Sequence, residues 1–243
     1  MGTIVGPLIQ AMHLDGTSQY AWRANPSFKN ASAGGVSIWF RLTATLAANG
    51  ATTLFCVADS GTQVGTFGKY IFFCVRRNNA AFGTGTYLDI TSIPTGSSPV
   101  LGKSGSTALS AGVWYNVIFG SDGKIYLNGV EEIYQYRPGA YYTSGWFSMF
   151  TATNKDLAVG AQKKAGSPSA FFGGDLMNVN YLPGRSFTST EAAEIYAAEK
   201  CAPPSSLSMY ASLAPIYTFN GNTNDLLNVE NLTAVASPTY ISP

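Results

Sequence analysis

Residues 109–132 read LSAGVWYNVIFGSDGKIYLNGVEE, and this stretch decides the fold. Side chains that favour strands run from Val113 to Phe119, and their period of two predicts a strand with two different faces, with Trp114 as a buried aromatic. Ser-Asp-Gly at 121–123 and Asn-Gly at 128–129 are typical of tight turns, because each supplies a residue that tolerates positive φ. Strands joined this closely form an antiparallel meander, and meanders stack into a sandwich or a barrel.

Similar apolar runs recur along the chain and predict further strands. They cover residues 37–42, 52–58, 70–76, 87–93, 146–151, 157–161 and 171–182, whereas residues 163–170 have the composition of a loop. A single short helix is expected in the C-terminal half. Thr188 can cap its N-terminus, Glu191 can return the hydrogen bond, and Phe187 lies just outside as a hydrophobic staple.

The length and charge of the chain bound its class. A chain of 243 residues and 25.7 kDa suits one large all-β domain or two small ones. We expect an N-terminal arm at 1–10 and one sandwich over 11–243, with 207–243 supplying a closing strand segment. Charged residues make up only 11% of the chain, and the net charge of +1 comes without a basic run. Nucleic acid is therefore not an expected partner.

The N-terminus also bears on location. No stretch approaches 18 apolar residues, and the first residues lack a basic region followed by an apolar core. The sequence therefore predicts no membrane span and no signal peptide. We expect a chain that starts in a cytoplasm.

Three cysteines leave one pairing question open. Cys56 and Cys74 lie on two apolar strands that could be neighbours, so a disulfide is conceivable. A buried thiol also behaves as a small hydrophobe, and we favour two thiols over a bridge. Cys201 follows the predicted helix and has no obvious partner.

The central stretch resembles the W-(H/Y)-x-V … D-G … (L/I)-Y-(V/L)-N-G core of the laminin G-like and concanavalin A-like lectin/glucanase superfamily. Blocks at 37–42, 157–162 and 171–199 follow in the family's order, and 13–28 looks like its opening strand pair with Asp15-Gly16 as the turn. The resemblance implies an all-β fold, an antiparallel two-sheet jelly-roll sandwich with one short helix.

The C-terminal segment 213–243 resembles a segment that many family members carry at the start of the domain. Domains of tailed-phage structural proteins often close in this way. The resemblance implies a virion structural protein that decorates the capsid, with the phage major capsid protein or another virion protein as its partner. The alternative is a lectin-like module of a tail appendage that binds a host surface glycan. Capsid or tail location and homo-oligomer formation stay open.

Catalysis is not expected. A glucanase of this superfamily carries a cluster such as E-x-D-x-x-E, which places carboxylates on one strand face, and the sequence has no such spacing. His13 is the sole histidine, and no Gly-x-Ser-x-Gly elbow is present, so nucleophilic catalysis and a zinc site are disfavoured. We therefore predict a protein that is not an enzyme and needs no cofactor.

Calcium remains a weak alternative because many laminin G-like domains bind one Ca²⁺ through hard oxygen ligands. Asp175 matches the family's aspartate after a glycine, although we favour the simpler explanation that this aspartate accepts backbone N–H groups in a turn. Asp59, Asp122, Asn222 and Asp225 also lie in predicted loops, and nothing in the sequence brings any two of them together.

Aromatic residues between 133 and 146 form the candidate binding surface. Exposed rings of this kind can anchor a protein interface or stack on a sugar, and they can also be mere packing. The candidate residues are Tyr134, Tyr136, Tyr141, Tyr142 and Trp146.

Overall fold

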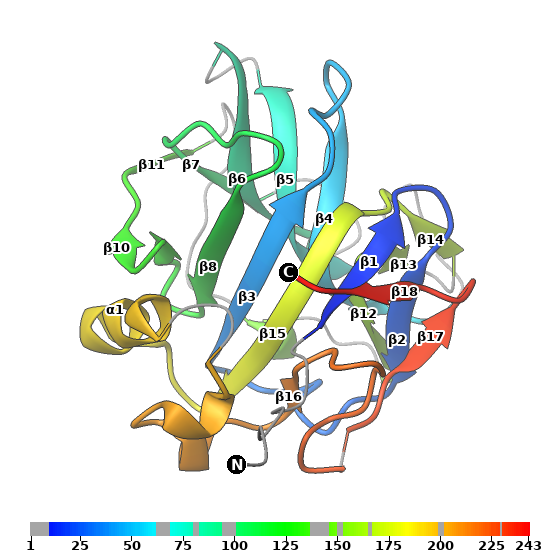
Figure 1. Cartoon of the computed structure of the whole chain (residues 1–243), viewed down its shortest axis with the longest axis vertical. Helices are drawn as coiled ribbons and strands as arrows, with labels where there is room; N and C mark the ends of the chain where they lie inside the picture. The colour runs from blue at the N-terminus through cyan, green and yellow to red at the C-terminus, as the bar shows by residue number, and fades with distance from the viewer. Residues whose placement is uncertain are drawn as a thin grey trace, which may run out of the picture.

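The computed structural model describes residues 10–61, 69–79, 83–93, 101–136, 146–149, 153–164, 167–198, 202–228 and 230–243. Two antiparallel sheets pack face to face (Figure 1), so the predicted all-β jelly-roll sandwich is confirmed. Sheet A has the order β10 (Val130–Glu131), β9 (Ile125–Leu127), β8 (Trp114–Gly120), β3 (Gly34–Leu42), β15 (Gly173–Pro183), β1 (Ala11–Asp15) and β18 (Thr239–Ile241), and β16 (Ile216–Tyr217) pairs with β15.

Sheet B forms the opposite layer, and a separate hairpin of β13 (Gln162–Lys164) and β14 (Ser167–Ser169) adjoins it. Its order is β11 (Tyr134–Tyr136), β7 (Leu101–Gly105), β6 (Gly83–Ile93), β5 (Tyr70–Asn79), β4 (Ala51–Asp59), β12 (Lys155–Val159), β2 (Tyr20–Ala24) and β17 (Thr233–Val235).

The period of two in the central stretch has the expected consequence. On β8, Tyr115, Val117 and Phe119 face the core between the sheets, where the Phe119 ring stacks on Phe73 of sheet B with centroids 4.4 Å apart. Ile118 points the other way, into a second apolar cluster on the outer face of sheet A. Here "outer face" means the face turned away from the other sheet. The strand is thus apolar on both sides at this end of the sheet.

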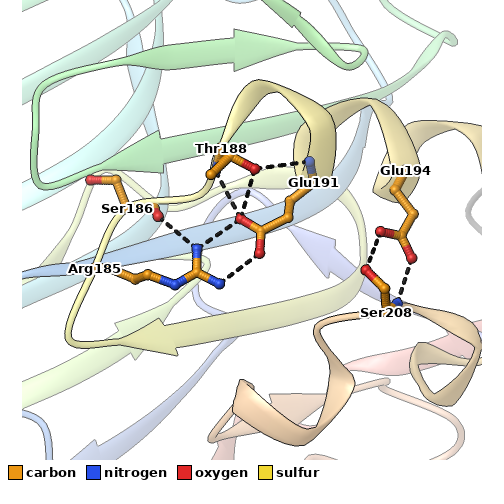
Figure 2. A network of polar contacts seen from close by, with 6 residues as sticks. All are labelled: Arg185, Ser186, Thr188, Glu191, Glu194 and Ser208. Carbon is orange, nitrogen blue, oxygen red and sulfur yellow. Dashed lines mark hydrogen bonds and ion pairs between the residues drawn. The ribbon is translucent and has the colours of Figure 1, made fainter.

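Helix α1 (Ser189–Ala197) and the 3-10 turns η2 (Pro204–Ser206) and η3 (Tyr210–Ser212) build that second cluster over one end of sheet A, as Figure 1 shows. The helix begins with the predicted capping box, in which Thr188 and Glu191 exchange hydrogen bonds. Figure 2 shows the same Glu191 carboxylate accepting two hydrogen bonds from Arg185, while Glu194 accepts from Ser208. These polar contacts fasten the helix and the following turns to each other and to the end of β15.

The C-terminal segment enters both sheets. β16 pairs with β15 and β18 pairs with β1 in sheet A, whereas β17 pairs with β2 in sheet B. The N-terminal arm expected at 1–10 lies, except for Gln10, outside the described residues.

Four local predictions were wrong. β1 and β2 do not pair with each other, because Asp15 and Gly16 begin a turn that carries the chain from one sheet to the other. The predicted strand at 146 is a 3-10 turn, η1 (Phe147–Met149), and part of the predicted loop 163–170 is the β13–β14 hairpin. Trp114 lies on the outer face of sheet A and is only partly buried, since the register of β8 turns Tyr115 inward.

The prediction of two thiols in place of a disulfide is confirmed for Cys56 and Cys74. Cys56 and Cys74 are both buried on neighbouring strands, and no disulfide joins them. Cys201 lies outside the described residues.

Candidate functional site

A row of polar and aromatic side chains crosses the outer face of sheet A, at the end that the helix does not cover. Each member is the direct cross-strand neighbour of the next, over five adjacent strands. We call this set the polar row: Trp114, Arg41, Asp175, His13 and Thr239.

The strand period explains why these side chains share one face. Phe40 and Leu42 on β3, and Leu176 on β15, point into the core between the sheets. Arg41 and Asp175 alternate with them and therefore point outward. The register, which only the folded sheet fixes, then sets them side by side.

Asp175 is the buried centre of the row. Its Oδ1 accepts a hydrogen bond from Nδ1 of His13, and its Oδ2 accepts one from Nε of Arg41, both at 2.7 Å. The Asp175 side chain is 1% exposed, whereas those of Arg41 and His13 are 26% and 36% exposed. Because a carboxylate only accepts, Nδ1 of His13 is the donor and Nε2 is left for a further partner. The buried aspartate thus orients two partners that reach the surface.

Arg41 lies between its anion and an aromatic ring. Its guanidinium carbon is 5.0 Å from the centroid of the Trp114 ring, a cation–π geometry. No described residue accepts a hydrogen bond from the two terminal nitrogens of Arg41. A fixed guanidinium with open terminal nitrogens suits a planar oxyanion such as a carboxylate, which it can bind through two parallel hydrogen bonds.

A second cation, Lys163, lies on the outer face of sheet B. Its ammonium, carried there by the β13–β14 hairpin, pairs with Asp156 and lies 3.9 Å from the centroid of the Trp22 ring. The side chains of Lys163 and Asp156 are 8% and 5% exposed. This cluster is closed and therefore acts as an internal fastening of the hairpin to the sheet.

A third charged group, Lys155, is wholly buried on β12. Burial, helped by the positive charge of Lys29, lowers the pKa of Lys155 to about 8. A depressed lysine pKa can mark a functional site. Here the ammonium donates to the backbone oxygens of Lys29 and Phe147 and to Oδ1 of Asn30. All three acceptors belong to the loop after β2 and to η1, so we assign Lys155 the role of holding these two segments together.

The aromatic surface predicted from the sequence is not assembled as expected. Trp146 is fully buried and stacks on Phe147 with centroids 4.6 Å apart, so it is a core residue and not part of a binding surface. Tyr134 lies on edge strand β11 and is 38% exposed. Tyr136 follows on the same strand, and Tyr141 and Tyr142 lie outside the described residues.

The calcium prediction for Asp175 meets a different environment. Its Oδ1 accepts a hydrogen bond from His13 and its Oδ2 accepts one from Arg41, and the adjacent positive charge of Arg41 disfavours a second cation at this carboxylate. Asp175 also lies on a strand and not in a turn, so the backbone-donor alternative is wrong. Within the described ranges, no group of three or more histidine, cysteine, aspartate or glutamate side chains is arranged to hold a metal. None of the described helices is long and apolar enough to cross a membrane.

The comparisons bear on the fold. No protein-family model matches the chain, and no curated protein sequence does so at a significant level. The structure is similar to the Ruminococcus gnavus IT-sialidase CBM40 bound to α2,3 sialyllactose, with a TM-score of 0.60 and 15% identity over 79% of this chain and 100% of that chain. It is also similar to a protein from Bacteroides ovatus ATCC 8483 described as carbohydrate binding, with a TM-score of 0.62 and 14% identity over 98% of this chain and 60% of that chain.

A third similar structure is the heptameric SAP-like pentraxin of Limulus polyphemus, with a TM-score of 0.57 and 12% identity over 97% of this chain and 96% of that chain. At such identities the likeness concerns the fold. The chain has the jelly-roll architecture of carbohydrate-binding modules and pentraxin.

Proposed function

We propose that the protein is a non-catalytic carbohydrate-binding module whose polar row binds an acidic sugar. The observation that carries this proposal is Arg41, held by the buried Asp175 with its terminal nitrogens open beside Trp114. The similar CBM40 structure, which is bound to sialyllactose, supports a glycan as the ligand class. Sialic acid carries a carboxylate, a group that a guanidinium binds through two parallel hydrogen bonds.

Each member of the row has a role in this proposal. The terminal nitrogens of Arg41 bind the carboxylate, Nε2 of His13 binds a sugar hydroxyl, and Trp114 offers an apolar surface to the C–H groups of the ring. Asp175 is a positioning residue, because its oxygens are both engaged within the protein. A row without an unengaged carboxylate also supports binding in preference to hydrolysis.

The test is calorimetric titration with 3′-sialyllactose and with lactose. We expect 3′-sialyllactose to bind more tightly, and Arg41→Lys to weaken its binding at least about tenfold, roughly 1.4 kcal/mol, because lysine keeps the charge and loses the planar fork. Arg76→Lys is the matched control, since Arg76 also lies near a buried aspartate, Asp89, but on sheet B. Equal affinity for the two sugars, or equal losses in the two variants, would refute the acidic-sugar assignment.

The decoration of a phage capsid stays a prediction from the sequence resemblance, as do the virion location and the capsid partner. The similar structures are a CBM40 bound to sialyllactose, a protein described as carbohydrate binding and a pentraxin, and they support the lectin-like alternative better than the capsid role. A glycan-binding module can belong to a virion appendage, and proteomics of purified particles would test that location.

A further inference from the structure

A pocket lined by asparagine amides lies in the segment between β16 and β17 (orange in Figure 1), and none of its lining residues belongs to the polar row. It is open to solvent, with a volume of about 250 Å³. That is close to the lower end of the range for small-molecule sites, roughly 300–1,000 Å³. The polar lining comes mainly from Asn220, Asn222, Asn224 and Asn228, with Thr218 and Leu226 beside them.

The pocket is built on a firmly anchored loop. Asp225 is buried, and its Oδ1 accepts the backbone N–H groups of Ile216 and Leu227 at 2.8 and 3.3 Å. Its Oδ2 accepts the backbone N–H of Glu230 at 3.2 Å. Thr223 donates from Oγ1 to the backbone oxygen of Leu232 at 2.8 Å. These hydrogen bonds fix the loop through its buried side chains and do not engage its solvent-facing side chains.

The backbone of this loop departs from ordinary conformations. Phe219 has φ of 55° although its ring is fully buried and stacks on Tyr217. Positive φ is uncommon for a bulky residue and persists only where the surroundings impose it. Asn228 has φ of 56° as well. The buried ring therefore forces the direction in which the chain leaves the core and presents the asparagines.

Three of the amides are open to a ligand. Asn222 is fixed, because its Oδ1 accepts the backbone N–H of Asn224 at 2.8 Å and its Nδ2 donates to the backbone oxygen of Asn220 at 3.3 Å. In the described part of the chain, the side-chain amides of Asn220, Asn224 and Asn228 make no hydrogen bond. Leu226, 47% exposed, adds an apolar surface at the rim.

The chemistry of this lining selects the ligand class. An amide both donates and accepts, as a sugar hydroxyl does, whereas the one carboxylate of the pocket already accepts three backbone N–H groups. An acidic ligand finds no cation in this lining, and the Asp225 carboxylate, although it is an anion, already satisfies the backbone donors beneath the loop. We infer that this pocket is a second binding site, for a neutral hydroxyl-rich ligand such as an uncharged monosaccharide unit.

The pocket and the polar row share no residue. Tyr217, at the entrance of the loop, pairs with Val179 of β15, four residues beyond Asp175 of the polar row. Four residues of strand correspond to about 13 Å. The inference thus goes beyond the proposed function, and it stands or falls without the polar row.

The experiment is an NMR titration of the isotope-labelled protein with the methyl glycosides of glucose, galactose, mannose and N-acetylglucosamine. Each is taken up to about 50 mM, above the roughly millimolar Kd that a small polar ligand gives. We expect at least one sugar to shift the side-chain amide signals of Asn220, Asn224 and Asn228. No shift with any of the four sugars would overturn the inference.

Variants give a second readout. Replacing Asn220 and Asn224 together by alanine should weaken binding at least about tenfold, whereas Asn154→Ala, at an exposed asparagine outside the pocket, should not. Arg41→Lys should also leave neutral-sugar binding unchanged. Equal binding by the double variant, or loss of binding in Arg41→Lys, would contradict a separate site.

Discussion

The outer face of each sheet carries a cation between a carboxylate and a tryptophan ring, but the cation is buried on one sheet and partly exposed on the other. Sheet A has Arg41 between Asp175 and Trp114, and sheet B has Lys163 between Asp156 and Trp22. On sheet B the cation is brought by a hairpin that lies over the sheet, and both charged side chains are less than 10% exposed. On sheet A the arginine is part of the sheet and remains 26% exposed.

This difference shows why residue type alone does not identify a binding site. An ammonium is a compact point charge, and in the sheet B cluster the carboxylate and the ring occupy it inside the protein. A guanidinium has five donors in a rigid fork, so Nε can bind Asp175 while the terminal nitrogens face outward. The first arrangement stabilises the fold, and the second leaves donors for a ligand.

Removing the two cations should give the largest difference in the free energy of unfolding between the two sheets. Lys163→Ala leaves Asp156 buried without its cation, and we expect a loss of about 4 kcal/mol in the free energy of unfolding. Arg41→Ala should cost about 2 kcal/mol, because Asp175 keeps His13 and water reaches the exposed side of the site. Urea denaturation measures both values.

Equal losses for Lys163→Ala and Arg41→Ala would remove the distinction between a closed and an open cluster. Arg185→Ala is a suitable reference, since its partner Glu191 lies nearer the surface and exposed ion pairs contribute about 1 kcal/mol or less.

Replacing the two tryptophans should give a smaller difference in the free energy of unfolding. Both rings are partly exposed, but Trp22 lies beneath a desolvated ammonium and Trp114 beside a solvated guanidinium. Cation–π energies are about 2 kcal/mol in the desolvated case and about 0.5–1 kcal/mol in the exposed case. We therefore expect Trp22→Ala to lower the free energy of unfolding by about 1 kcal/mol more than Trp114→Ala.

Thermal and urea unfolding of the two tryptophan variants would test this order. A larger loss for Trp114→Ala would mean that Trp114 is the more deeply buried ring, as the sequence predicted.

The smallest effect concerns the helix that covers the other end of sheet A. The hydrogen bond from Arg185, together with those from Thr188, lowers the pKa of Glu191 to about 2. A carboxylate with a depressed folded-state pKa stabilises the protein above its ordinary value near 4.5, and this contribution is lost as the pH falls through about 2. Glu191→Gln should therefore cost about 1 kcal/mol at pH 7 and much less at pH 2.

Unfolding midpoints of Glu191→Gln at pH 7 and pH 2 measure this dependence. Glu131→Gln is the control, since Glu131 forms an exposed pair with Lys124 and caps no helix. An undiminished difference between wild type and Glu191→Gln at pH 2 would show that the capping network of Figure 2 does not titrate as described.

Local patterns were sufficient for most of the secondary structure. The alternation along β8, the turn at 121–123 and the capping box of Thr188 and Glu191 depend on neighbours a few residues apart, and the structure has all three. Trp146 was misassigned because an aromatic residue after a turn has the same local pattern whether it faces the core or solvent. Its burial depends on Phe73, more than 70 residues away in the chain.

The sequence by itself determined an all-β sandwich, its main strands and its one capped helix, because each follows from short-range periodicity and turn chemistry. Only the tertiary structure decided which charged residues meet. His13, Arg41 and Asp175 are separated by up to 162 positions, and a register shift of one residue would point Asp175 into the core. The site is therefore a property of the pairing between distant strands, which no single segment of the chain contains.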